Sequence, residues 1–292
     1  VDNTTRSGRA IFFGGYMRPD SPYSSGRNGL TIEFFQMTTG GESANFGGYG
    51  SRRTNTSGCS NGTRALSASG YNGPGTLGSS NEIEYITIAS EGNPIDFGDR
   101  TQTGYGGQAL SSSTRGIFLS NREPSNNVID YVEIGTLGNA IDFGDLVANG
   151  GYKAGNLNSP TRGFVAGGSG VLGTNSNDIQ MITIASKGNA VKFGELTRTT
   201  AYPSGGGDGV RGIIVAGLSP SISKFIDQIT IASTGNAVDF GGQCVVAGGN
   251  RGGSGCTKTR MVYGVGTSPS SDYSNILEFI VINSNENSQE FG

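Results

Sequence analysis

The sequence predicts an all-β fold, a six-bladed β-propeller with four-stranded antiparallel blades. Three observations lead to this prediction. A unit of about 49 residues recurs six times along the 292-residue chain. Each unit holds short, β-branched apolar segments without helical periodicity. The 52 glycines follow no collagen-like period and are expected to mark many turns.

A Phe-Gly pair anchors the repeat. Asp-Phe-Gly occurs at 96–98, 142–144 and 239–241, and Asn, Lys or Glu replaces the Asp in the other three copies. The six phenylalanines are spaced by 46 to 51 residues: Phe46, Phe97, Phe143, Phe193, Phe240 and Phe291. The predicted units are residues 1–47, 48–98, 99–144, 145–194, 195–241 and 242–292. Together they make a single domain.

Two further markers precede each Phe-Gly pair. One is an isoleucine-rich stretch such as "IDQITIASTGNAVDFG", which begins at Ile226 and has clear or worn counterparts in all units. The other is a short apolar stretch that starts with arginine, such as "RGIIVAG". The six arginines are Arg9, Arg64, Arg115, Arg162, Arg211 and Arg260.

The Asp-Phe-Gly tripeptide is also the magnesium-binding signature of protein kinases. A kinase needs its catalytic magnesium ligand once, whereas this chain has six copies of the motif and the residue at the acidic position differs among them. The chain has no histidine, so a kinase His-Arg-Asp loop, a Ser-His-Asp or Cys-His nucleophile and a histidine-ligated metal site are excluded. We therefore expect no enzymatic activity, no metal and no cofactor.

Each of the four predicted strands has its own sequence character. The innermost is rich in small residues, as in 146–160, which suits the place where sheets converge on the axis. The arginine stretch is the second strand. In "IDQITIAS" both faces are partly apolar, so this third strand is expected to be covered on both sides by neighbouring sheets. "AVDFG" is the fourth strand, reached through "STGN", whose Gly-Asn pair is a hairpin turn signal.

The ends of the chain pose a counting problem. Six units supply the three clear strands, but only five inner segments lie between them. Either the sixth inner strand comes from sequence outside this chain, or one blade is short. Because a propeller closes on itself, we expect the first unit to pack beside the last.

The repeat resembles those of two known groups. The double glycine of "RAIFFGG" (9–15) and "RGFVAGG" (162–168) looks like that of kelch repeats, although the kelch tryptophan is missing. The unit I-x-x-I-T-I-A-S-x-G-N-A-x-D-F-G resembles, over nearly the whole chain, repeats in virion proteins of tailed bacteriophages, particularly marine ones.

The phage resemblance implies a non-enzymatic virion protein, extracellular and present in several copies beside other virion proteins. It would serve structural assembly or host-surface adhesion on a tail fibre, a tail tip or the capsid surface. A host surface glycan is then a possible ligand. The alternatives are a carbohydrate-binding lectin propeller outside a virus and a glycan-processing enzyme, which would need paired carboxylates. No acidic pair stands apart from the repeat.

The composition of the chain argues against nucleic acid and membranes as partners. The net charge is −3, charged residues make up 15%, and no basic run is present, so nucleic acid is not expected as a partner. No apolar run of eighteen residues exists, so we expect no membrane insertion, and the first ten residues lack the apolar core of a signal peptide. The cysteines Cys59, Cys244 and Cys256 are expected to be small buried thiols, with a Cys244–Cys256 bridge as the alternative.

Candidate ligand contacts lie in two places. Residues 14–30 form the longest connection between a second and a third strand, and variable loops on a rigid scaffold are where recognition usually sits. The candidate contacts within this loop are Tyr16, Arg18, Asp20, Tyr23 and Arg27. Tyr105, Tyr152 and Tyr202 follow their Phe-Gly pairs by eight or nine residues and should cluster at a channel mouth, either stacking on sugar rings or packing locally.

The recurrent arginines and phenylalanines are expected to be structural. We expect each arginine to tie a turn to a carboxylate such as Asp96, Asp142 or Asp239, although a basic ring that grips a polyanion is the alternative. We expect the phenylalanines to pack between blades rather than to line a ligand site.

Overall fold

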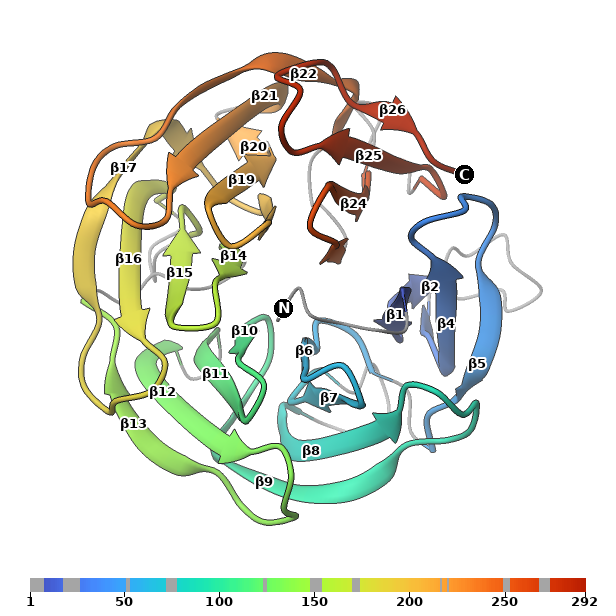
Figure 1. The fold of residues 1–292 in the computed structure, drawn as a ribbon. Coiled ribbons are helices and arrows are strands. Elements are labelled where there is room, and N and C mark those ends of the chain that lie inside the picture. Colours follow the sequence, from blue (N-terminus) through green and yellow to red (C-terminus); the bar gives the residue numbers. More distant parts are fainter. Residues whose placement is uncertain are drawn as a thin grey trace.

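The structure is a computed structural model in which every regular element is a β-strand. It describes residues 8–17, 27–50, 53–71, 78–122, 125–147, 154–169, 174–215, 217–219, 221–248, 253–267 and 274–292. Six antiparallel sheets surround a central axis, and the chain passes round the ring once (Figure 1). The predicted all-β, six-bladed propeller is confirmed. Among the described residues, no helix has the length and apolar character needed to cross a membrane.

The strands follow the predicted order from the axis outward. The inner strands are β6 (Ser57–Ser60), β10 (Gln108–Ser111), β14 (Gly155–Asn158), β18 (Ser204–Gly207) and β23 (Ser254–Cys256). The second strands, which all begin at a repeat arginine, are β1 (Arg9–Phe13), β7 (Arg64–Ala68), β11 (Arg115–Arg122), β15 (Arg162–Ala166), β19 (Arg211–Val215) and β24 (Arg260–Gly264).

The outer half of each blade comes from the other two strands. The third strands are β4 (Thr31–Gln36), β8 (Ser80–Thr87), β12 (Ser125–Glu133), β16 (Ser176–Thr183), β21 (Ser221–Thr230) and β25 (Leu277–Val281). The outermost are β5 (Ala44–Gly48), β9 (Ile95–Gly104), β13 (Ile141–Asp145), β17 (Val191–Thr200), β22 (Val238–Gly248) and β26 (Gln289–Glu290). Three short strands decorate the loops: β2 (Tyr16–Met17), β3 (Arg27–Asn28) and β20 (Leu218–Ser219).

The first blade is the exception to the four-strand rule. Its described part has three strands, in the order β1-β4-β5. In blades 2 to 5 the inner strand begins seven residues before the repeat arginine, and the positions at this offset before Arg9 lie outside the described residues. As predicted, the first unit packs beside the last: Phe35 and Met37 share a buried cluster with Val262, and the Phe35 and Phe291 rings are 5.1 Å apart.

Small polar residues tie the inner strands to one another. The Asn158 side chain donates to the Ser111 carbonyl at 2.6 Å, and the Ser111 hydroxyl donates to the Ser60 carbonyl at 2.7 Å. A Cβ added at Gly205 would lie 2.6 Å from the Asn156 carbonyl oxygen. The glycine, serine and asparagine of these segments therefore match a ring in which neighbouring strands nearly touch.

The Phe-Gly pair sits at a β-bulge in the outermost strand. In blade 3, Ile129 pairs with Gly144 and Asp130 with Asp142, so Phe143 is the extra residue. The same shift occurs in blades 1, 2 and 4. A bulge re-aims a side chain, and here it turns the phenylalanine into the space between blades.

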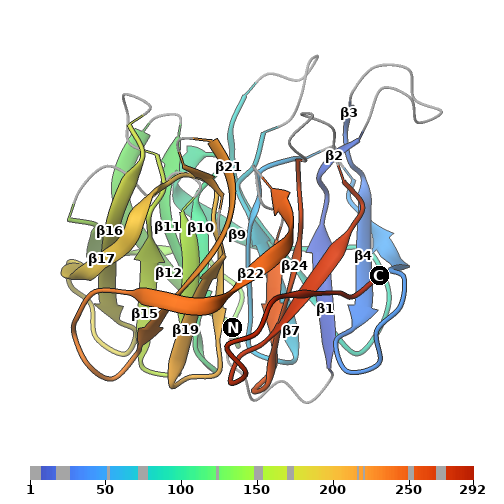
Figure 2. The ribbon, with the colours of Figure 1, turned by 90° about the horizontal axis from the view of Figure 1, so that it is seen from above.

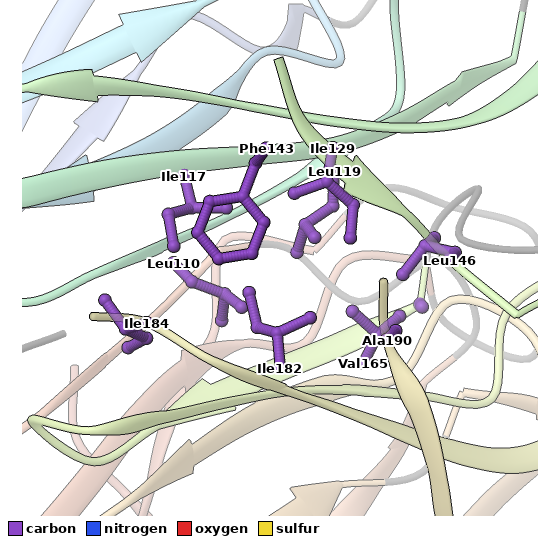
Figure 3. Packing of buried hydrophobic residues seen from close by; sticks show 11 residues of the cluster. Leu110, Ile117, Leu119, Ile129, Phe143, Leu146, Val165, Ile182, Ile184 and Ala190 are labelled. Atoms are coloured by element: carbon purple, nitrogen blue, oxygen red, sulfur yellow. The ribbon is translucent and has the colours of Figure 1, made fainter. Parts of the chain in front are cut away.

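Each phenylalanine belongs to a different inter-blade cluster. Figure 3 shows Phe143 with Leu110 and Ile117 of its own blade, facing Ile182 and Ile184 of blade 4. Five of the six rings are at most 3% exposed, and Phe291 is half-buried. Six such clusters, one per junction, confirm the predicted packing role.

In five of the six units the glycine directly after the phenylalanine is required by the next blade, and in blade 5 the second glycine, Gly242, has this role. A Cβ on Gly144 would lie 2.5 Å from the Gly188 carbonyl oxygen, and the Gly144 φ is +148°. At four other junctions a Cβ on the glycine after the phenylalanine would lie 2.1 to 2.6 Å from a backbone oxygen of the next blade, and a Cβ on Gly242 of blade 5 would lie 2.0 Å from the Glu286 carbonyl oxygen. The tripeptide that resembles a magnesium site is thus explained by close backbone packing.

The third and outermost strands form the predicted hairpin, but the Gly-Asn pair is not its turn, because the turn residues are 231–233. The connection from β21 to β22 spans 231–237, and its Gly-Asn pair reaches back to the preceding blade. Gly235 N donates to the Phe193 carbonyl at 3.2 Å, and Asn236 Oδ1 accepts from Glu195 N at 3.0 Å. The longer loop provides partners for backbone groups that a tight turn would leave unpaired. The asparagines that make the same bond, at 2.9 to 3.1 Å, are Asn93, Asn139, Asn189 and Asn287.

Five of the repeat arginines bond backbone carbonyls of the next blade, and Arg115 Nε also donates to the Glu133 carboxylate of its own blade at 3.0 Å, which is the kind of partner predicted. Arg115 Nη1 donates to the Ile184 and Ala185 carbonyls of the next blade at 3.0 and 2.8 Å. The arginines that bond the equivalent carbonyl are Arg9, Arg64, Arg162 and Arg211. The expected carboxylates Asp96, Asp142 and Asp239 are exposed on the outer strands, whereas each arginine begins a second strand and faces the neighbouring turn.

Substitution Gly144→Ala tests the blade joint. The new Cβ meets the Gly188 carbonyl and a left-handed φ, so we expect the free energy of unfolding to fall by roughly 2–4 kcal/mol in denaturant titration. Gly135→Ala is the control, because a Cβ there has nothing within 4 Å. Equal effects of the two substitutions would contradict the close-packing explanation.

Candidate binding face

The two ends of the propeller differ in their connections. Because neighbouring strands are antiparallel, the turns between inner and second strands lie at one end, which we call the turn end. The links between second and third strands lie at the other, the loop end. In the five blades whose inner strand is described, the turn between the inner and the second strand has three residues, as at 61–63. The links between second and third strands range from two residues (123–124) to seventeen (14–30). The connections that differ in length between blades therefore lie at the loop end.

The predicted loop 14–30 carries a small ribbon of its own. Tyr16 pairs with Asn28 and Met17 with Arg27, which places β2 and β3 above blade 1 at the loop end (Figure 2). Gly29 N donates to the Gly15 carbonyl at 2.6 Å and closes its base. Of the remaining predicted contacts, Arg18, Asp20 and Tyr23 lie outside the described residues.

Two of the three predicted tyrosines, Tyr105 and Tyr202, are described, and they lie at the same end but on different blades. Tyr105 lies three residues before β10 and Tyr202 two residues before β18, near one end of the inner strands, as expected. Tyr105 is only 8% exposed and its ring contacts Tyr71 of blade 2, with centroids 5.3 Å apart. Tyr105 therefore favours the local-packing alternative. Tyr152 lies outside the described residues.

Tyr71 is the exposed aromatic that sequence reasoning missed. It is 38% exposed, and its backbone bridges Thr54 and Ser79. It directly follows "RALSASG", which is the position that Tyr16 occupies after "RAIFFGG". Aligning the residue after each arginine stretch would have found it.

A charged cluster supports this end between blades 1 and 2. Arg53 is 3% exposed and forms ion pairs with Glu82 and, at 3.2 Å, with Glu84. Its guanidinium also lies 5.7 Å from the centre of the Tyr49 ring. Burial raises the pKa of Glu84, although the Arg53 charge opposes that shift. The cluster holds the base of the loops and leaves Glu82 half open to solvent.

A second, fully buried ion pair joins blades 2 and 3. Arg100 Nε and Asp130 Oδ1 are 3.0 Å apart, and both side chains have no exposed surface. Arg100 Nη1 also donates to Asn121 at 2.9 Å, and Thr101 N donates to Asp130 at 3.0 Å. Burial lowers the pKa of Arg100, and Asp130 opposes that shift.

Asp130 is one case of a rule that the sequence did not reveal. In blades 3 to 6, one polar side chain of the third strand accepts a backbone N–H from the preceding blade: Asp130, Gln180, Asp227 and Glu278. Gln180 accepts from Val147 at 2.7 Å, and Asp227 accepts from Thr197 at 2.9 Å. Glu278 accepts from Val246 at 2.7 Å and from the Tyr263 hydroxyl at 2.5 Å. These carboxylates and the Gln180 amide therefore bond neighbouring blades to each other.

The remaining titratable groups include the three cysteines and the acidic side chains. In the described ranges, no group of three or more His, Cys, Asp or Glu side chains could hold a metal ion. All three cysteines are free and buried, so the Cys244–Cys256 bridge is not formed. Burial raises the pKa of Cys59 to about 12 and that of Cys256 to about 11. The loop end instead offers exposed aromatic and charged side chains on a rigid base.

Comparison with known proteins adds no assignment. No family model matches the chain, and no curated protein matches it significantly.

Asp130→Asn tests the buried pair. Removing its charge leaves the Arg100 cation buried without compensation, so we expect the free energy of unfolding to fall by about 3–5 kcal/mol in denaturant titration. Lys192→Ala is the control, because the Lys192–Asp178 pair lies at the surface and its loss should not measurably change stability. Similar losses in the two variants would show that burial of the Arg100–Asp130 pair is unimportant.

Asp227 predicts a dependence of stability on pH. Burial raises the pKa of Asp227, and two hydrogen bonds from Thr197 oppose the shift. The folded state thus binds the proton more tightly than the unfolded state. Wild type should lose stability relative to Asp227→Asn as the pH rises from the ordinary aspartate value, near 3.9, through the raised folded value. A stability difference that stays constant between pH 3 and pH 7 would contradict the shift.

Proposed function

We propose that this chain is a non-enzymatic bacteriophage virion protein, a propeller module whose loop end binds a partner during virion assembly or host-surface adhesion. The observation that carries the proposal is that different parts of each blade form the joints and the variable connections. Repeated residues form the joints, while connections of unequal length gather at one end. Rigid presentation limits the loop entropy lost on binding.

Two features support a recognition role at the loop end. Tyr71 presents an aromatic ring next to a buried one, and the β2–β3 ribbon rises beside it from the neighbouring blade. Backbone bonds such as Gly106 N to the Asn55 carbonyl, at 2.9 Å, join the loops of successive blades. A partner would meet one continuous surface.

The virion setting is supported by the repeat. The unit I-x-x-I-T-I-A-S-x-G-N-A-x-D-F-G resembles those of tailed-phage virion proteins, and multiple copies on one particle would add avidity to weak single contacts. A tail fibre, a tail tip or the capsid surface would each provide such multiplicity.

A carbohydrate-binding lectin outside a virus is the second candidate. The exposed face of Tyr71 favours it, because tyrosine offers an apolar face with a polar tip for a sugar ring. The two candidates share a ligand chemistry and differ in where the protein resides.

Two measurements test the proposal together. Mass spectrometry of gradient-purified phage particles from the source of this sequence should detect the chain in several copies per particle. Binding of the protein to host cells or a glycan array should fall at least tenfold with Tyr71→Ala and stay unchanged with Leu137→Ala, an exposed turn-end control. Absence from particles with retained sugar binding would favour the lectin, and absence of both would refute the two candidates.

A further inference from the structure

Four blades share an arginine–aromatic stack at the turn end. In each, an aromatic residue of the third strand lies beneath the repeat arginine of the second strand. The guanidinium carbon is 4.6 to 4.9 Å from the ring centre in the pairs Arg9–Phe34, Arg64–Tyr85, Arg115–Tyr131 and Arg260–Phe279. The strand register is the same in all four, because each arginine pairs with the residue two positions after the aromatic one.

Blade 5 keeps the arginine but lacks the ring. Arg211 pairs with Thr230, so the stacking position falls on Gln228. At this place the structure has a hollow of about 270 Å³, lined by Arg211, Gln228, Thr230, Val238 and the loop 233–236. In blade 4 the same position is filled by Met181.

The slot in blade 5 is built to receive a ring. Arg211 Nη1 donates to the Ile282 carbonyl at 3.4 Å and to Asn285 Oδ1 at 3.2 Å, so blade 6 holds the guanidinium in place. Val238, 57% exposed, supplies an apolar wall. Ser233 and Thr234 are exposed at the rim and offer hydroxyl groups.

We propose that this slot binds a tyrosine side chain presented by a partner protein. The precedent is internal: the groups that lie beneath the same arginine in four other blades are phenylalanine and tyrosine side chains carried on a polypeptide. Stacking on a guanidinium needs a flat π-system, and the hydroxyl rim together with the Gln228 amide suits a phenol better than a plain benzene ring. The slot lies at the turn end, so the inference does not depend on the loop-end function proposed above.

The test uses p-cresol, the tyrosine side chain as a free molecule, in saturation-transfer NMR with the whole chain. A ligand of this size should bind with a dissociation constant on the order of 1–10 mM. Gln228→Tyr should weaken that binding at least tenfold, because it fills the slot with the ring that blades 2 and 3 already carry. The same variant should raise the melting temperature by about 2–4 °C if the new stack forms.

Two controls distinguish ring stacking from nonspecific hydrophobic binding. The saturated analogue 4-methylcyclohexanol has nearly the same shape but no π-system and should bind at least fivefold more weakly. Tyr85→Gln opens the equivalent position beneath Arg64 and should add a second p-cresol site. The proposal is overturned if p-cresol fails to bind, if Gln228→Tyr binds it as well as wild type, or if the saturated analogue binds equally.

Discussion

The whole ring depends on one contact, the packing of a bulged phenylalanine and its glycine against the backbone of the next blade. The bulge turns the ring into the inter-blade space, where it fills a cluster such as that of Phe143. Because the glycine has no side chain, the Gly-Asn backbone of the next blade comes close enough to form three hydrogen bonds. At the junction of blades 3 and 4, Gly188 N donates to the Phe143 carbonyl at 2.9 Å. Asn189 Oδ1 accepts from Asp145 N at 3.0 Å, and Ala190 N donates to the Asp145 carbonyl at 2.8 Å. Apolar burial and backbone satisfaction are thus achieved by the same few residues.

Polar side chains buried between blades also form hydrogen bonds that join one blade to the next. Each buried carboxylate or amide at the position of Asp130 replaces a hydrogen bond that the neighbouring outer strand cannot make within its own sheet. Where an arginine is also buried, as at Arg100, its charge is balanced by the acid of the next blade. Such pairs add little net stability but penalise any arrangement in which the partners separate, so they help to fix the order of the blades.

The joints leave the two ends of the ring free to differ. At the turn end, short turns recur and four blades have an arginine stack; Met181 takes the place of the ring in blade 4, and blade 5 has the slot beneath Arg211. At the loop end, connections of unequal length stand on cross-linked backbone, and Tyr71 and the β2–β3 ribbon emerge from them. The turn end is therefore regular and the loop end variable.

The sequence by itself determined the number of blades, the strand order, the packing role of the six phenylalanines and the location of the variable loops. It could do so because burial imposes the same residue types at the same spacing in every unit. It did not determine the partners of the repeat arginines, the role of the Gly-Asn pair, the buried Arg100–Asp130 joint or the exposure of Tyr71 over Tyr105. Those contacts join residues about 20 to 70 positions apart on adjacent blades. Only the tertiary structure decided them, because the relative placement of two sheets fixes which polar groups meet and which ring faces solvent.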